Sequence, residues 1–156
     1  MSGFHAEVRI DAWPERVWEL LLRFEDYPKW TRALALSGKA EKGPMDHVVP
    51  LARRAGPIRR VSCPGEVTRL KPGRSLAWSF GWAGLVRFEL SFELEPDGRG
   101  CRLRHGIEAQ RQFSRIVGVR PERLLKRPFE VFVNDVRRRL EGPAPPQPKP
   151  LAGRKI

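Results

Sequence analysis

Polar and apolar residues alternate along several segments of the chain. The alternation runs through residues 76–82, 86–94 and 101–109, where every second residue is apolar apart from His105, and it also occurs in residues 4–10. A period of two is typical of strands that bury one face. Three such segments in succession predict an antiparallel sheet with one covered face.

An amphipathic helix is predicted directly after the first strand. Pro14 suits its first turn, because the N–H that proline lacks would have no helical partner there. Apolar residues then recur at helical spacing up to Phe24. We expect this helix to end near Glu25–Asp26, since Tyr27 precedes a proline and is disfavoured in helical geometry. A second short turn is expected from Pro28 to Thr31.

A longer helix is predicted near the end of the chain, where apolar residues between Leu125 and Leu140 form one stripe. Pro128 lies inside this pattern and is expected to kink or split the helix, because proline removes one backbone hydrogen bond. The basic, proline-rich residues 143–156 are expected to form a flexible tail. Residues 1–142 would then form a single folded domain.

The order of these elements predicts an α+β architecture. Glycine and proline residues divide the region between the two helices into segments of strand length. Pro64–Gly65 interrupts one such segment, residues 60–70, and predicts a bulge or kink that helps the sheet to curl. We therefore expect a curved seven-stranded antiparallel sheet wrapped around a long C-terminal helix, with two short helices after the first strand.

The composition is that of a globular, strongly basic protein. The 156 residues carry a formal charge of +12, but arginine is spread along the whole chain instead of forming one block. The sequence contains no run of about 18 apolar residues, so no transmembrane helix is predicted. The first residues lack the pattern of a secretory signal. Only Cys63 and Cys101 are present, with no metal-binding spacing. We expect a cytoplasmic protein.

Two motifs, PERVWELL and FEDYPKW, carry a resemblance to a known family. Their characteristic residues are Pro14, Val17, Trp18, Phe24, Tyr27, Pro28 and Trp30. With the order of elements, they make residues 4–142 resemble the SRPBCC superfamily, also called START-like or helix-grip proteins, and most closely its bacterial polyketide cyclase/dehydrase-like members. The resemblance implies an apolar cavity between sheet and C-terminal helix. Members bind lipids, sterols or polyketides, and some catalyse cyclisation, dehydration or hydrolysis, without a universal catalytic motif.

Inward-facing residues of the sheet and the last helix are the candidate lining of such a cavity. They are Trp78, Phe80, Phe88, Leu90, Phe92, Leu103, His105, Ile107, Phe129, Phe132 and Val133. Aromatic walls of this kind suit a small hydrophobic ligand that is lipid- or polyketide-like. The alternative is that these side chains simply fill the core.

His105 is the candidate acid or base, because it shares the inward parity of Leu103 and Ile107. Its alternative role is that of a satisfied core histidine. Glu66 is the acid that could pair with it. His47 could face either way, and its default interpretation is an exposed strand histidine. His5 is expected to be solvated. Histidines scattered in this way predict no metal site, and we expect no cofactor.

Three functions are compatible with the sequence. The first is a carrier or sensor that binds a small hydrophobic molecule, and the second is a cyclase or dehydratase that uses His105. The third is a polyanion-binding module, although no specific nucleic-acid partner is expected. Its candidate residues are Arg111, Arg115, Arg120, Arg123, Lys126, Arg127, Arg137, Arg138 and Arg139.

Overall fold

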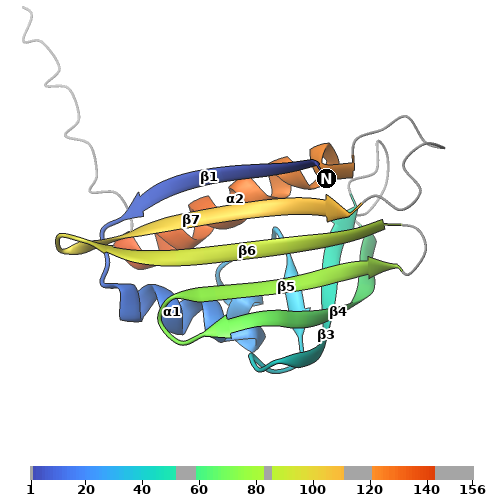
Figure 1. Cartoon of the computed structure of the whole chain (residues 1–156), viewed down its shortest axis with the longest axis horizontal. Helices are drawn as coiled ribbons and strands as arrows, with labels where there is room; N and C mark the ends of the chain where they lie inside the picture. The colour runs from blue at the N-terminus through green and yellow to red at the C-terminus, as the bar shows by residue number, and fades with distance from the viewer. Residues whose placement is uncertain (1, 52–58, 83–85, 111–120, 143–156) are drawn as a thin grey trace, which may run out of the picture.

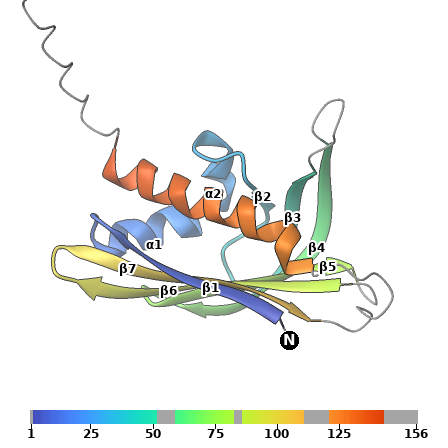
Figure 2. The ribbon, with the colours of Figure 1, turned by 90° about the horizontal axis from the view of Figure 1, so that it is seen from above.

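An antiparallel sheet curves around one long helix in the computed structural model, which describes residues 2–51, 59–82, 86–110 and 121–142. Helix α2 (Pro121–Glu141) lies across the inner face of the sheet, as Figures 1 and 2 show. The described strands are β1 (Ser2–Ile10), β2 (Ala35–Ser37), β3 (Gly43–Leu51), β4 (Arg59–Lys71), β5 (Ser75–Trp82), β6 (Val86–Asp97) and β7 (Gly100–Gln110). The predicted α+β architecture is confirmed.

The strands follow one another across the sheet in the order β1-β7-β6-β5-β4-β3-β2. Consecutive strands from β2 to β7 are therefore antiparallel neighbours, and β1 closes the far edge beside β7. The alternation in the sequence decides which face is covered, since Phe88, Leu90 and Phe92 of β6 are buried. Figure 2 shows β3 and β4 rising from one end of the sheet beside the N-terminal half of α2.

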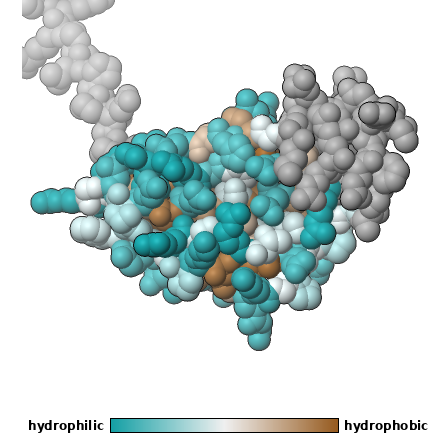
Figure 3. Space-filling model, in the orientation of Figure 1, coloured by the Kyte–Doolittle hydropathy of each residue, from teal (hydrophilic) through white to brown (hydrophobic). Residues whose placement is uncertain are grey.

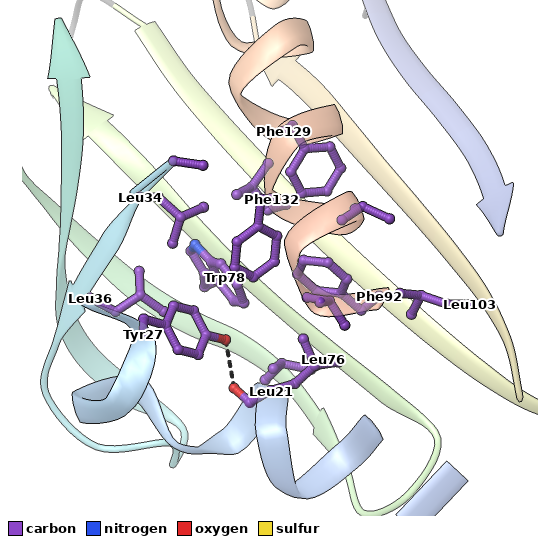
Figure 4. Packing of buried hydrophobic residues seen from close by; sticks show 14 of the residues in the cluster. Leu21, Tyr27, Leu34, Leu36, Leu76, Trp78, Phe92, Leu103, Phe129 and Phe132 are labelled. Carbon is purple, nitrogen blue, oxygen red and sulfur yellow. Dashed lines mark hydrogen bonds between the residues drawn. The ribbon is translucent and has the colours of Figure 1, made fainter. Parts of the chain in front are cut away.

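The first helix is shorter than predicted. Helix α1 (Pro14–Leu22) stops before Arg23, whose φ of −83° and ψ of 72° are not helical, and the 3-10 helix η1 (Phe24–Lys29) follows. This break turns both Phe24 and Tyr27 into the core. The Tyr27 hydroxyl donates to the carbonyl of Leu21 at 2.6 Å (Figure 4), which binds η1 to the end of α1.

The predicted bulge at Pro64–Gly65 is misplaced. Pairing of β3 with β4 runs through both residues without a register shift, and the shift in β4 lies between Val67 and Arg69. Gly65 has another role, because a Cβ atom there would lie 2.5 Å from the Ser79 carbonyl oxygen. The glycine therefore permits close approach of β4 and β5.

Helix α2 is continuous through Pro128, so the proline does not split it. Its C-terminal half is tied to the rest of the fold. The Thr31 hydroxyl donates to Oδ2 of Asp135 at 2.8 Å and accepts from the backbone N–H of Ala33 at 3.1 Å. Near the end of α2, Glu141 Oε1 accepts from the backbone N–H of Asp11 at 2.9 Å.

Residues 143–156, for which a flexible tail is predicted, lie outside the described residues. The same holds for the segments 52–58, 83–85 and 111–120. No helix among the described residues is long and apolar enough to cross a membrane.

The substitution Thr31→Val tests the tie between α2 and the segment before β2. We expect it to lower the free energy of unfolding by about 1–3 kcal/mol, because a buried N–H and a half-buried carboxylate each lose a partner. The matched control is Thr68→Val, which removes only an exposed contact of 3.4 Å to Glu89 and should change stability by less than about 0.5 kcal/mol. Urea unfolding measures both, and equal losses would contradict the assignment.

Candidate functional site

Trp78 of β5 lies at the centre of the inner face. Its side chain is completely buried, with the rings of Phe24 at 5.9 Å and Phe92 at 5.3 Å between centroids. In Figure 4 the aromatic side chains of β5, β6, η1 and α2 converge on this region. The indole N–H of Trp78 donates to Nδ1 of His47 at 3.1 Å, which satisfies a polar group that has no access to water.

His47 of β3 is the polar residue at this position, and the expectation that it is exposed is wrong. Only 2% of the residue is accessible. Its ring stacks on Phe80, with centroids 3.7 Å apart and planes inclined by 4°. Burial lowers the pKa of the His47 imidazole from 6.5 to about 3. The ring is therefore neutral near pH 7.

A small apolar cavity adjoins His47, between the sheet and the N-terminal half of α2. Its volume is about 20 Å³, which is room for about one water molecule. The described lining consists of Ala33, Leu34, His47, Phe80, Leu90, Ile107, Leu125, Pro128 and Phe129. Among the described residues, side chains fill most of the space between the inner face of the sheet and α2.

The residues expected to line a cavity are all buried, but the structure gives them different positions. Phe80, Leu90, Ile107 and Phe129 border the cavity. The remaining predicted lining residues do not border the cavity and lie in the surrounding core, namely Trp78, Phe88, Phe92, Leu103, His105, Phe132 and Val133. Sequence reasoning missed His47 and the residues that precede β2, of which Ala33 and Leu34 form part of the wall.

His105 of β7 lies inward, as its parity predicts, and is 6% exposed. Its ring contacts Phe129 edge-on, with centroids 5.2 Å apart, and its buried Nδ1 has no hydrogen-bond partner among the described residues. Burial lowers the pKa of the His105 imidazole, while the charge of Glu130 acts in the opposite direction. A neutral imidazole with a free ring nitrogen can accept a proton.

The structure does not bring Glu66 to His105. Glu66 lies on the outer face of β4, where its exposed carboxylate is 3.7 Å from the guanidinium of Arg87. Arg87 also donates to the hydroxyl of Ser79 at 2.7 Å. A carboxylate on the opposite face of the sheet cannot orient an imidazole on the inner face, so this pair is not formed.

The outer face of the sheet carries charges of both signs. Figure 3 shows this face as mainly hydrophilic, with small apolar patches. An open groove of about 500 Å³ crosses it. Within the groove, Arg104 lies 3.0 Å from Glu7, and Arg69 lies 3.8 Å from Glu93. Such paired charges are typical of a solvated surface.

The predicted polyanion-binding residues are only partly described. Arg111, Arg115 and Arg120 lie outside the described residues, as does the side chain of Arg123. The other candidates lie on α2, where Lys126, Arg127, Arg137, Arg138 and Arg139 are exposed. Two of them face acids, since Arg137 is 3.0 Å from Glu141 and Arg138 is 3.5 Å from Asp135.

Cys63 and Cys101 are free and buried, and burial raises the pKa of both thiols. Neither is therefore activated as a thiolate. Exposed His5 lies 3.3 Å from Glu108 on the outer face. Among the residues that the structure describes, no group of three or more histidine, cysteine or acidic side chains could hold a metal ion.

A pH titration tests the burial of His47. Folding lowers the pKa of His47, so as the pH falls the imidazole is protonated in the unfolded chain before it is protonated in the folded one. The free energy of unfolding therefore decreases as the pH drops from 6.5 toward 3. For this one group the slope approaches about 1.4 kcal/mol per pH unit. We expect His47→Phe to reduce the slope of the unfolding free energy against pH between pH 6 and pH 4. The reduction should correspond to the contribution of about one histidine. Identical slopes in the variant and the native protein would contradict a buried neutral His47.

The comparisons with known proteins agree with this geometry. Residues 1–141 match the model of the family described as "Polyketide cyclase / dehydrase and lipid transport". A search of curated protein sequences finds no significant match. Several solved structures share the fold at low sequence identity. Protein MLL2253 from Mesorhizobium loti is 20% identical with a TM-score of 0.68, over 90% of this chain and 97% of that one.

Two further structures are similar. Protein CV1439 from Chromobacterium violaceum is 15% identical with a TM-score of 0.68, over 92% of this chain and 100% of that one. CalU16 from Micromonospora echinospora is 17% identical with a TM-score of 0.63, over 92% of this chain and 77% of that one. At these identities the structural matches show the fold, and the family match covers nearly the whole chain. The chain therefore belongs to the polyketide cyclase/dehydrase and lipid transport family, within the SRPBCC, or START-like, superfamily.

Proposed function

We propose that this protein is a carrier or sensor for a small hydrophobic molecule, lipid- or polyketide-like, which binds between the sheet and the N-terminal half of α2. The observation that carries the proposal is the apolar cavity beside His47, at the place where sheet and helix face each other. The family match over residues 1–141 supports it independently. The two buried free thiols also suit the reducing conditions of the cytoplasm.

Entry of a ligand requires one wall of the cavity to move. Ligand pockets commonly measure about 300–1,000 Å³, whereas this cavity measures about 20 Å³. The N-terminal half of α2 is the wall best suited to move, because Thr31 and Asp11 hold only the C-terminal half through the hydrogen bonds described above. Pro128 further weakens the N-terminal half, since it donates no backbone hydrogen bond to the preceding turn.

A cyclase- or dehydratase-type enzyme that uses His105 is the second candidate. The observation that favours it is the buried Nδ1, which has no hydrogen-bond partner among the described residues. Such an atom costs stability, and a functional role is one reason for a protein to retain it. The lowered pKa of His105 suits a general base better than a general acid at neutral pH. The described residues offer it no carboxylate in hydrogen-bond contact, which favours the carrier or sensor.

Filling the cavity tests the first candidate. Ala33→Leu places a larger side chain in the cavity wall, and Ala12→Leu adds the same groups at a buried position that does not border the cavity. Both should cost about 1–3 kcal/mol of stability by overpacking. We expect only Ala33→Leu to weaken binding of a hydrophobic fluorescent probe, by about tenfold or more, which corresponds to about 1.4 kcal/mol. Equal affinities for the two variants would contradict a site in this cavity.

The substitution His105→Phe tests whether the buried imidazole of His105 lowers the stability of the fold. An apolar ring at this position removes the unpartnered Nδ1 and retains the contact with Phe129. We expect the free energy of unfolding to rise by about 1 kcal/mol at pH 7, since a buried unsatisfied atom is removed. Thermal and urea unfolding measure this change. Clear destabilisation would indicate that the imidazole has a structural partner and would argue against a catalytic role.

A further inference from the structure

We propose that strand β1 is an interaction edge for a second copy of this chain, and that two copies pair antiparallel along β1 to form one continuous sheet. This inference goes beyond ligand binding, because it assigns a partner to the outer border of the fold. It follows from the position of β1 in the sheet, from the charges on one face of the strand and from the apolar side chains beside it.

Strand β1 is the last strand on its side of the sheet. It pairs with β7 along its whole length, Ser2–Ile10, without a register shift. No described strand pairs with its other side, and Figure 1 shows β1 at the border of the sheet. Edge strands are commonly protected by a proline, a lysine or a bulge. The described pairing of β1 contains none of these, so its free backbone groups suit another extended strand.

The charges of β1 specify both the partner and the register. His5, Glu7 and Arg9 share the exposed outer face of the strand. When Val8 lies on a twofold axis, Glu7 of each copy is opposite Arg9 of the other, and His5 is opposite Asp11. Opposite charges across an antiparallel pair are stabilising and like charges are destabilising. The pattern is therefore complementary to itself, as the contact between two identical copies requires.

The two charged side chains nearest the axis can take a further partner. Glu7 accepts from Arg104 at 3.0 Å and lies 3.2 Å from Arg102, and its side chain is 45% exposed. A carboxylate has about four acceptor sites, so Glu7 can also accept from Arg9 of a second copy. Arg9 lies 3.5 Å from Asp97, and its side chain is 52% exposed. Pairing extends this surface network across the axis.

Apolar side chains at this border are incompletely covered. On the inner face of β1, Phe4, Ala6 and Val8 are half-buried, whereas Ile10 is buried completely. Trp13 follows the end of the strand and is 57% exposed, more than any other large apolar residue that the structure describes. Antiparallel pairing brings this end of β1 beside the start of the second copy's β1, where Phe4 lies. Burial of these groups would contribute most of the affinity.

A charge exchange tests the pairing. Glu7→Arg places positive charges opposite each other across the axis, and Arg9→Glu places negative charges there. Each variant alone should dimerise about tenfold more weakly than the native chain, because the twofold axis repeats each unfavourable pair. An equimolar mixture of the two variants should recover the dimer, since each pair then joins opposite charges. Sedimentation velocity at low salt measures the mass of each sample against the chain mass of 17.9 kDa.

The matched control is Glu66→Arg, which makes the same charge change on β4. Glu66 is also exposed and also faces an arginine, with 3.7 Å between its carboxylate and the guanidinium of Arg87. This variant should dimerise like the native chain. A native protein that is monomeric at micromolar concentration would overturn the proposal. A dimer that survives both single exchanges, or that the mixture does not recover, would overturn the pairing along β1.

A second measurement uses only the native protein, so it does not depend on the folding of a variant. Amide hydrogen exchange is compared at concentrations above and below the dimer dissociation constant. Exchange in β1 should be slower at the higher concentration, whereas exchange in β2, the strand at the opposite end of the sheet order, should not change. Exchange in β1 that is independent of concentration would overturn the proposal.

Discussion

The buried N–H of Trp78 is the constraint on which the site depends. A completely buried indole must find an acceptor, and that acceptor is Nδ1 of His47, which comes from β3, two strands away in the sheet order. The hydrogen bond thus joins the middle of the sheet to the part that rises beside α2 (Figure 2). It also determines the protonation of His47 and places a polar group beside an otherwise apolar cavity.

Aromatic side chains from several elements fill the rest of the space between the sheet and α2. Phe92 and Phe132 pack at 5.8 Å from each other across the gap between sheet and helix, and Tyr27 of η1 contacts Phe132 at 5.4 Å. These contacts fill the region under the anchored half of α2. The cavity remains at the other half, where Pro128 and Phe129 face His47 and Leu34. A filled core and a small cavity thus lie along the same helix.

Much of the fold could be predicted from the sequence, because alternation and helical spacing report directly which face of each element is buried. The inward positions of Phe80, Leu90, His105 and Ile107 follow from such parity. The burial of His47 was missed, although Met45 has the same parity and is also buried. Parity within one strand does not reveal that a tryptophan on another strand requires an acceptor.

Other errors have a similar physical origin. The non-helical backbone of Arg23 and the position of the register shift near Val67 depend on tertiary packing, which local propensity does not encode. The Glu66–His105 pair failed because residues of apparently suitable chemistry lie on opposite faces of the sheet. Sequence alone also could not distinguish a filled core from a cavity. That difference amounts here to about 20 Å³ of space among closely packed side chains.

The most direct test of the account is the position of a bound ligand, measured by intermolecular NOEs between the hydrophobic fluorescent probe and ¹³C-labelled methyl groups. The account predicts NOEs to Leu34, Leu90 and Ile107, which border the cavity from the segment before β2, from β6 and from β7. Saturated binding with NOEs to the outer face of the sheet, and none to these three residues, would contradict a ligand site between the sheet and α2.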